Sequence, residues 1–334
     1  MPRPASLLAV LTNREMEEFL PEPLWSGVCE LPVRFARIDP EPLTTAAFHE
    51  ALLASNPEIL LACWKTPPLP ARLPDNLRYV CYLAGSIKHL VAREHLERGL
   101  IVTNWGGSVS RVIAEWALFH ILSGLRHATH WALAMHGCDG WKGDSTRTAS
   151  LFGRRVGLHG FGPVARELVA LLRPFGCAIS AFAPDVDAAA EAKYGITRAG
   201  TLQGLFAAND IIVELAPLIP ATRGIVTEEL LRLIPPGGVF VNVGRGAVVD
   251  EAALLRVAQE GQIAVGLDVY AVEPLPADSG FRALANVTLT PHLAGPTNDR
   301  RRDSGELALR QLRAYAEGRP LPAAITPRVY DSST

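Results

Sequence analysis

The sequence lacks the features that mark exported, membrane-spanning and nucleic-acid-binding proteins. Its five cysteines, at 29, 63, 81, 138 and 177, form no CxxC pair, which favours reduced thiols over a disulfide framework or a zinc site. No apolar run reaches the roughly 20 residues of a membrane-spanning helix, and the first run, 7–11, is too short for a signal peptide. The 32 basic and 34 acidic residues are interspersed and leave a formal net charge of −2, so no basic face is available for phosphates. We therefore expect a cytoplasmic protein that binds neither membrane nor nucleic acid.

Length and composition favour a globular α/β protein of two domains. The chain has 334 residues, 49% of them hydrophobic and 20% charged, and single cores normally stop growing at about 250–300 residues. Short apolar runs at 7–11, 58–64, 77–84 and 100–104 predict buried strands with helices between them. From 110 to about 135, apolar periodicity with few breakers predicts one extended helix that bridges the domains.

A second alternating series begins near residue 154. It predicts strands at 154–160, 178–183, 210–216, 238–244, 264–270 and 286–292. Such a series is typical of a doubly wound nucleotide-binding sheet, and a last helix at about 299–317 would return to the first domain. We predict an α/β fold of two Rossmann-like, doubly wound parallel-sheet domains, the first discontinuous in sequence. Residues 1–104 plus 295–334 would bind substrate, and 105–294 would bind a dinucleotide.

A glycine-rich segment follows the first strand of this second series. It reads Gly160-Phe161-Gly162-Pro163-Val164-Ala165, and a helical pattern begins at once. Gly160 permits a tight turn, Gly162 lets the backbone approach a pyrophosphate, and the small Ala165 allows helix and strand to pack closely. The helix N-terminus supplies unsatisfied N–H groups for the phosphates. This strand, turn and helix together predict a dinucleotide site.

The position that normally binds the adenosine ribose carries an unusual residue. An acidic residue is expected about 20 residues after the glycines, but Ala183 stands there, and Asp185 follows two residues later. Either Asp185 reaches the ribose from that position or this contact is missing. The segment 183–190 has no Arg or Lys to pair with a 2′-phosphate. The sequence thus favours NAD as cofactor and does not exclude NADP.

Three polar side chains follow three predicted strands of the second series: Arg245, Glu273 and His292. Because ligands of open parallel sheets bind at the carboxyl ends of strands, these side chains could converge on one cleft. Arg245 can hold a substrate carboxylate with two parallel hydrogen bonds. Histidine titrates near neutral pH, which makes His292 the candidate acid/base. Glu273 would fix the imidazole ring and favour its protonated form, and Asp268 could hold the nicotinamide amide.

The ordered motifs resemble those of the D-isomer-specific 2-hydroxyacid dehydrogenase family over nearly the whole chain. The matching segments are LFGRRVG before the glycines, APLIPATRGIVTEELL, NVGRGAVVDEAALLRV, GLDVYAVEPLP and TPHLAG. The resemblance implies an NAD(P)-dependent 2-hydroxyacid dehydrogenase that works as a 2-oxo acid reductase, with Arg245, Glu273 and His292 as catalytic residues. It also implies a homodimer built through the long helix.

The predicted binding sites include residues around these motifs. The cofactor contacts are Gly160, Phe161, Gly162, Pro163, Val164, Ala183, Asp185, Ala216, Pro217, Thr222, Val243, Gly244, Asp268, His292 and Ala294. The substrate contacts are Ala84, Gly85, Ser86, Arg245 and His292. No metal site is predicted, because the spacing of His127, His130, His136 and Cys138 matches no zinc pattern.

The loop that would hold the substrate departs from the family pattern. Family members usually have a glycine-rich loop followed by Asp, whose backbone N–H groups hold the substrate carboxylate. Here Gly85 and Ser86 keep such donors, but Lys88 stands where the Asp is common. The sequence therefore does not identify the substrate. Trp64 and Lys65 follow another predicted strand, and they either face the cleft or belong to a surface loop. An NAD(H)-sensing, corepressor-like protein of the same fold remains an alternative, against which the three catalytic residues argue.

Overall fold

The protein consists of two compact units, shown by a computed structural model that describes residues 5–137, 140–321 and 323–332. One unit contains Met1–Val109 and Pro296–Thr334, and the other contains Ser110–Gly295. The divisions after 109 and 295 lie close to the predicted boundaries after 104 and 294. The binding role of each unit stays a prediction.

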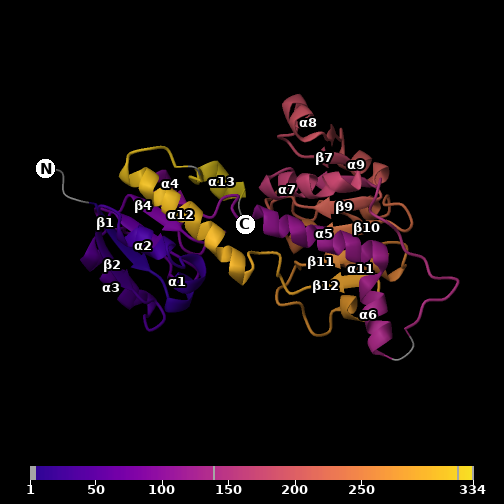
Figure 1. Ribbon diagram of the computed structural model, residues 1–334, viewed down its shortest axis with the longest axis horizontal. Helices are drawn as coiled ribbons and strands as arrows, with labels where there is room; N and C mark the ends of the chain where they lie inside the picture. The colour runs from indigo at the N-terminus through magenta and orange to yellow at the C-terminus, as the bar shows by residue number, and fades with distance from the viewer. Residues whose placement is uncertain (1–4, 138–139, 322, 333–334) are drawn as a thin grey trace. The chain divides into compact units, whose positions relative to one another are not determined.

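The first unit is built on a five-stranded parallel sheet (Figure 1). Its strands are β1 (Ser6–Val10), β2 (Arg34–Ile38), β3 (Ile59–Ala62), β4 (Tyr79–Tyr82) and β5 (Ile101–Thr103). Its helices are α1 (Asn13–Phe19), α2 (Leu24–Cys29), α3 (Thr45–Ser55), α4 (Arg93–Glu97), α12 (Arg301–Ala316) and α13 (Pro327–Ser332). The strand order β2-β1-β3-β4-β5 is one of the two common doubly wound orders, and α12 places Leu309 and Leu312 in this unit's core.

Strand β2 is the strand of the first unit that the sequence did not predict. It lies at the edge of the sheet, pairing only with β1 in the described part of the chain, from Ser6 opposite Arg34 to Val10 opposite Ile38. Its residues are exposed or half-buried, and two of the five are arginines. An edge strand of this composition has no continuous apolar run, so the hydrophobic pattern did not reveal it.

The second unit is built on a seven-stranded parallel sheet in the order β12-β11-β10-β9-β6-β7-β8. Its strands are β6 (Arg155–His159), β7 (Ala178–Phe182), β8 (Thr197–Arg198), β9 (Ile211–Glu214), β10 (Val239–Asn242), β11 (Ala264–Leu267) and β12 (Val287–Leu289). Its helices are α5 (Ser110–Arg126), α6 (Ala128–His136), α7 (Pro163–Leu172), α8 (Ala188–Tyr194), α9 (Leu202–Ala208), α10 (Glu228–Leu231) and α11 (Glu251–Gln259). This is the classic dinucleotide-binding order with one more strand at the edge. The prediction of two doubly wound parallel sheets is confirmed.

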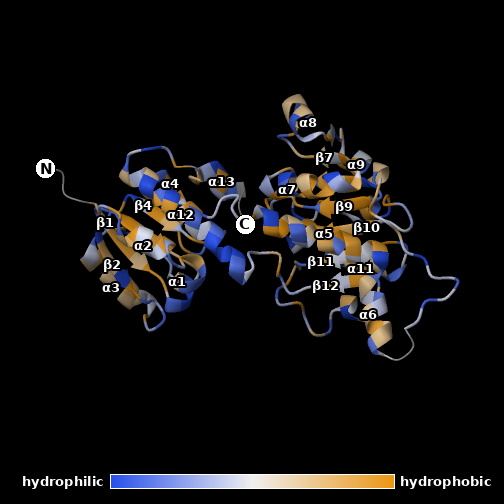
Figure 2. Cartoon of the chain, viewed as in Figure 1, coloured by the Kyte–Doolittle hydropathy of each residue, from blue (hydrophilic) through white to orange (hydrophobic). Residues whose placement is uncertain are grey.

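Both faces of this sheet are covered by helices. Along β9, Ile211 and Val213 pack with α5 and α7, whereas Ile212 packs with α9, α10 and α11. The same alternation recurs in β10, because successive side chains of a strand point to opposite faces. Figure 2 accordingly colours the central strands as hydrophobic, which is typical of a sheet buried on both sides.

The prediction of one extended helix over 110–135 is wrong. The segment forms two helices, α5 and α6, separated by His127, whose φ of 50° is left-handed. A left-handed residue ends a helix because the following residues cannot continue its hydrogen-bond ladder. Polar and apolar periodicity continues across the break, so the sequence pattern did not show it.

The structure adds one finding on membranes and one on thiols. None of the helices in the described ranges is long and apolar enough to cross a membrane. Cysteines 29, 63, 81 and 177 are free thiols, whereas Cys138 lies outside the described residues.

Candidate active site

The glycine turn after β6 has the geometry that the sequence predicted for it. Gly160 has a φ of +93°, and a Cβ on it would lie 2.7 Å from the Ala216 nitrogen, so glycine is required there. Gly162 caps α7, Pro163 follows at the first helical position, and a Cβ on Gly162 would meet nothing within 4 Å. Open space therefore faces the N-terminus of a helix, which is where a pyrophosphate binds in this fold.

The loop after β7 brings a cation next to the candidate ribose residue. Asp185 is exposed and lies 3.5 Å from the guanidinium of Arg166, which α7 carries. The guanidinium carbon of Arg166 also lies 5.7 Å from the ring centroid of Phe161 and 5.7 Å from that of Tyr194, within the range of a cation–π contact. Arg166 lies outside the segment 183–190, where the sequence shows no cation, because α7 brings it from 19 residues earlier in the chain.

The ends of β9 and β10 bring further predicted cofactor residues to the same edge of the sheet. The Thr222 hydroxyl donates to the Pro217 carbonyl at 2.5 Å and accepts from the Ile219 N–H at 2.9 Å, which fixes the loop after β9. A Cβ on Gly244 would lie 3.1 Å from the Glu214 carbonyl, so the turn after β10 approaches the end of β9 closely. Val243, just before it, is buried.

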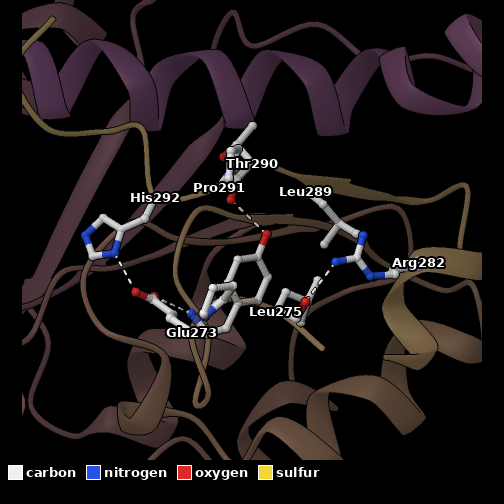
Figure 3. Close-up of a pocket in the computed structure, with 9 residues that line it drawn as sticks. Glu273, Leu275, Arg282, Leu289, Thr290, Pro291 and His292 are labelled. Atoms are coloured by element: carbon white, nitrogen blue, oxygen red, sulfur yellow. Dashed lines mark hydrogen bonds and ion pairs between the residues drawn. The ribbon is translucent and has the colours of Figure 1, made fainter. Parts of the chain in front are cut away.

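His292 and Glu273 form the centre of the candidate active site. His292 Nδ1 and Glu273 Oε2 are 2.7 Å apart (Figure 3). The other oxygen of Glu273 accepts the Tyr270 N–H at 3.0 Å, so the carboxylate is held from two sides. His292 has a left-handed φ of 54°, which is uncommon for a residue with a side chain and occurs often at functional sites. Both side chains remain partly exposed, so a ligand can reach the far nitrogen of the ring.

Arg245 lies in the turn after β10. A Cβ on Gly246 would lie 1.9 Å from the backbone carbon of Tyr270, so this turn packs directly on the segment that leads to Glu273. Burial lowers the pKa of the Arg245 guanidinium, and the negative charge of Glu273 opposes that shift. Its Nη1 donates to the Gly244 carbonyl at 2.7 Å. The guanidinium is thus partly desolvated, which strengthens its attraction for an anion.

Asp268 is completely buried and holds the backbone that follows His292. Its two oxygens accept from the Leu293 N–H and the Ala294 N–H, each at 2.8 Å. They also accept from the Thr290 hydroxyl at 2.6 Å and from the Trp116 indole at 3.0 Å. The carboxylate therefore fixes the chain on both sides of His292. Its predicted contact with a nicotinamide amide stays a prediction.

A second histidine lies behind this network on α5. His120 is fully buried, and its Nε2 is 3.1 Å from the Thr290 hydroxyl. Because that hydroxyl donates to Asp268, it accepts from His120, and Nδ1 of His120 is then an acceptor that has no hydrogen-bond partner among the residues that the structure describes. Burial lowers the pKa of His120 to about 4.

His292 and Glu273 border a cavity of about 620 Å³. Its wall includes Tyr270, Glu273, Arg282, Thr290 and His292. In Figure 3 Arg282 lies on the opposite side of this cavity from His292, where its guanidinium donates to the Leu275 and Pro276 carbonyls. Burial raises the pKa of Tyr270 to about 12, so its hydroxyl stays protonated and donates to the Thr290 carbonyl.

The predicted substrate loop lies in the first unit, after β4. A Cβ on Gly85 would lie 2.4 Å from the ring of Trp105, so this ring covers the glycine. The Asn104 side chain donates to the Gly85 carbonyl at 2.7 Å, and the Trp105 N–H donates to the Ala84 carbonyl at 3.1 Å. These contacts fix Ala84, Gly85 and Ser86 beyond the carboxyl end of their strand, where ligands of such sheets bind.

The residues that the sequence left open have contacts within the same unit. The ammonium of Lys88 lies 5.8 Å from the ring centroid of Tyr330 on α13. Trp64 is 41% exposed, and the guanidinium of Arg301 lies 4.9 Å from its ring centroid. The Lys65 N–H donates to Glu15 at 2.8 Å, which holds the loop after β3. Within the described ranges, no group of three or more His, Cys, Asp or Glu side chains is arranged to hold a metal ion.

The model of the D-isomer-specific 2-hydroxyacid dehydrogenase NAD-binding domain matches residues 118–294, more than half of the chain and all within the second unit. The chain belongs to the D-isomer-specific 2-hydroxyacid dehydrogenase family. This is a family of NAD(P)-dependent oxidoreductases of small 2-oxo and 2-hydroxy acids, so the resemblance seen in the sequence is confirmed.

Known relatives carry several substrate names. A glyoxylate/hydroxypyruvate reductase of Arabidopsis thaliana is 31% identical over 266 residues, which are 77% of this chain and 78% of that protein. A hydroxyphenylpyruvate reductase of Plectranthus scutellarioides is 32% identical over 241 residues, 70% of this chain and 72% of that protein. The D-3-phosphoglycerate dehydrogenase of Mycobacterium tuberculosis is 34% identical over 231 residues, but the match spans 68% of this chain and only 43% of that longer enzyme.

Solved structures of this 2-hydroxyacid dehydrogenase family share the fold. The apo D-mandelate dehydrogenase of Rhodotorula graminis superposes with a TM-score of 0.83 at 21% identity, covering 96% of this chain and 98% of that one. The NAD complex of a D-isomer-specific 2-hydroxyacid dehydrogenase from Lactobacillus delbrueckii ssp. bulgaricus gives 0.79 at 19% identity, covering 96% and 100%. At these identities the likeness shows the fold alone.

Proposed function

We propose that this family member is an NAD(P)-dependent 2-hydroxyacid dehydrogenase of the D-isomer type that works as a 2-oxo acid reductase. The observation that carries the proposal is the hydrogen bond of 2.7 Å between His292 and Glu273 at the carboxyl edge of the dinucleotide-binding sheet. Arg245 lies in the neighbouring turn, close enough for Glu273 to influence its pKa. An acid/base residue, its orienting carboxylate and a cation are the groups that hydride transfer to a 2-oxo acid needs from a protein.

In this proposal each of the three residues has one step. Arg245 binds the substrate carboxylate with its two-pronged guanidinium and so aims the 2-oxo group at the histidine. The Nδ1 of His292 is bound to Glu273, so its Nε2 is the atom that gives a proton to the substrate oxygen. Glu273 stabilises the imidazolium before that transfer and keeps the ring in one orientation after it. Reduced nicotinamide, when bound, supplies the hydride to C2 of the substrate.

The residues of the second unit fit a dinucleotide. Gly160 and Gly162 have no side chains, so the backbone at the start of α7 is accessible from open space. The ends of the adjacent strands carry four further candidate residues: Ala216, Pro217, Val243 and Gly244. We propose NAD as the cofactor, because Asp185 can accept a hydrogen bond from a ribose 2′-hydroxyl and would repel a 2′-phosphate. Arg166 beside it is the feature that would favour NADP.

We further propose that Ala84, Gly85 and Ser86 contact the substrate, with the first unit as the substrate domain and the second as the cofactor domain. Lys88 carries a charge and Trp64 an aromatic ring, whereas a loop that holds only a carboxylate needs backbone N–H groups alone. The preferred 2-oxo acid therefore has to be measured.

A homodimer built through α5 and α6 is also part of the proposal. These helices expose Phe119, Leu122, Leu133 and Met135, an unusual number of large apolar side chains for a solvent-facing surface. Light scattering after size exclusion tests the dimer. The expected cytoplasmic location is tested by cell fractionation.

The central experiment follows oxidation of NADH and NADPH at 340 nm with glyoxylate, hydroxypyruvate, pyruvate, phenylpyruvate and 2-oxoisocaproate. The His292→Ala variant should lose at least about 100-fold in kcat, the scale of lost general acid catalysis, while it still binds NADH. Near-normal turnover by this variant would refute the role of His292. Binding of NADH without turnover of any acid by the wild type would favour the NAD(H)-sensing alternative instead.

A further inference from the structure

Two polar residues lie beneath the glycine turn and have no part in the mechanism above. His159 is the last residue of β6, and Glu214 is the last residue of β9. They are opposite each other in the register of these adjacent strands. The strand order reverses at β6, which has β9 on one side and β7 on the other, and dinucleotides bind across such a reversal.

Their side chains are in direct contact and almost completely buried. His159 Nδ1 lies 2.5 Å from Glu214 Oε2, and the two residues are 4% and 0% exposed. A contact of this length holds a proton between the two atoms, because two bare lone pairs would repel each other. The residues that precede the pair inside the sheet are buried and carry no polar side chain: Val156, Gly157 and Leu158 before His159, and Ile211, Ile212 and Val213 before Glu214.

The second oxygen of Glu214 reaches the loop that faces Gly160. Oε1 accepts the Ala216 N–H at 2.8 Å, and the Leu215 N–H donates to the His159 carbonyl at 2.8 Å. The Leu215–Ala216 peptide is the group that a Cβ on Gly160 would strike, at 2.7 Å. Glu214 thus joins the end of β6 to the peptide that forms the opposite wall of the glycine turn.

Stability alone is a poor explanation for such a pair. Replacing a buried ion pair with apolar residues of similar size is often neutral or stabilising, because both charges must be desolvated. Two aliphatic side chains would continue the pattern of β6 and β9. A role in dinucleotide binding accounts for the pair better. If the Leu215–Ala216 peptide is already fixed in the free protein, less conformational entropy is lost when the ligand binds.

We propose that His159 and Glu214 are positioning residues for the dinucleotide: their hydrogen-bonded pair holds the Leu215–Ala216 peptide against the Gly160 turn at the spacing that the pyrophosphate requires. The inference rests on the proposed cofactor site of the second unit. It adds two residues that act on cofactor affinity through the backbone and touch neither substrate nor the reacting atoms.

The test compares NADH affinity, measured by isothermal titration calorimetry, in the wild type and in the double variant H159I/E214L. The double variant leaves no unpaired buried charge, although the Ala216 N–H loses its acceptor, so it should still fold, with a Tm close to that of the wild type. Its Kd for NADH should rise by about 10-fold or more. At saturating NADH its kcat should stay within about 3-fold of the wild type, since the catalytic residues are untouched.

The single variant Glu214→Gln separates the hydrogen bond from the charge. Glutamine keeps an oxygen that can accept the Ala216 N–H, so its Kd should stay within about 3-fold of the wild type. A loss in Glu214→Gln as large as in the double variant would overturn the proposed role of that bond.

The chain offers a matched control at the other end of the same two strands. Asp210, just before β9, accepts from the Arg155 N–H at 3.1 Å and from its guanidinium at 2.6 Å, joining β9 to β6 at their amino ends. Asp210→Asn should lower the Tm and leave the Kd for NADH unchanged. An equal loss of NADH binding in Asp210→Asn would show that general strand stability is responsible, and would overturn the inference.

The outcomes distinguish this inference from the proposed function. Wild-type affinity for NADH in H159I/E214L overturns the inference alone. A wild type that binds neither NADH nor NADPH overturns both. A wild type that binds NADH but reduces no 2-oxo acid overturns the proposed reaction, and the comparison of Kd values still decides the inference.

Discussion

Replacing Asp268 with asparagine should destabilise the second unit and slow catalysis together. In the wild type the carboxylate accepts four hydrogen bonds and donates none. An asparagine oxygen at the Oδ1 position can keep the bonds from Trp116, Thr290 and the Leu293 N–H. Its NH2 group would then face the Ala294 N–H. Two hydrogen-bond donors would point at each other with no acceptor between them, at a fully buried position.

The size of the effect follows from the lost bond. A hydrogen bond to a charged group contributes about 1.5–3 kcal/mol, and a buried donor left unsatisfied costs about 1–3 kcal/mol. We expect a loss of about 3 kcal/mol in the free energy of unfolding, which corresponds to a Tm about 6–12 °C lower for a unit of this size. Because the Ala294 N–H lies two residues after His292, the ring should also lose its fixed position, and kcat should fall by about 10-fold.

The assay combines thermal unfolding followed by circular dichroism with kcat at saturating NADH and the best acid of the panel. Asp278→Asn is the control, since it makes the same chemical change at an exposed position. Unchanged Tm and kcat in Asp268→Asn would refute this reasoning. A rise in KM for NADH with wild-type kcat and Tm would instead support a direct contact between Asp268 and the nicotinamide.

Three further predictions address the substrate cation, the choice of cofactor and the buried histidine. Arg245→Lys should raise KM for the 2-oxo acid by about 10-fold or more, because lysine lacks the planar fork; unchanged KM would place the carboxylate elsewhere. Asp185→Ser should raise the kcat/KM ratio of NADPH to NADH by about 10-fold, because Arg166 would lose its carboxylate partner and become available to a 2′-phosphate; an unchanged ratio would remove both residues from the ribose site. His120 has its pKa lowered from 6.5 to about 4 in the folded state, so the unfolded chain binds the extra proton between these pH values. The free energy of unfolding should therefore fall by about 3 kcal/mol as the pH drops from 6.5 to 4, and His120→Gln should remove this part of the slope in denaturant titrations.

The sequence predicted the parts of the fold and site that repeat a strong local pattern. All strands of the two sheets except β2 and β8 followed from short apolar runs, and Gly160 and Gly162 were recognisable because a strand and a helix flank them. Glu273 and His292 were predicted to meet because both follow strands of one sheet, and the structure places them 2.7 Å apart.

The features that escaped prediction depend on contacts between distant segments. Arg166 approaches Asp185 only because α7 packs beside β7, and the left-handed turn at His127 leaves no mark in the periodicity. The segment 184–209 folds into α8, β8 and α9, which are too short to give a clear pattern. His159 and Glu214 could have been noticed from the sequence, since each is an ionisable residue directly after a run of apolar residues at the carboxyl end of its strand.

The return of α12 to the first unit has a consequence for the order in which the protein folds during synthesis. Residues of α12 complete that unit: a Cβ on Gly27 would lie 2.8 Å from Leu309, a Cβ on Gly305 would strike the Phe19 carbonyl, and the Ser304 hydroxyl donates to the Leu83 carbonyl. The second unit, which is continuous from Ser110 to Gly295, leaves the ribosome whole before any of these contacts can form. Domains generally fold as units as the chain emerges. The unit whose first strands are made earliest is therefore completed last, because α1, α2 and β4 have no α12 to pack against until that helix is made, while the second unit is already able to fold.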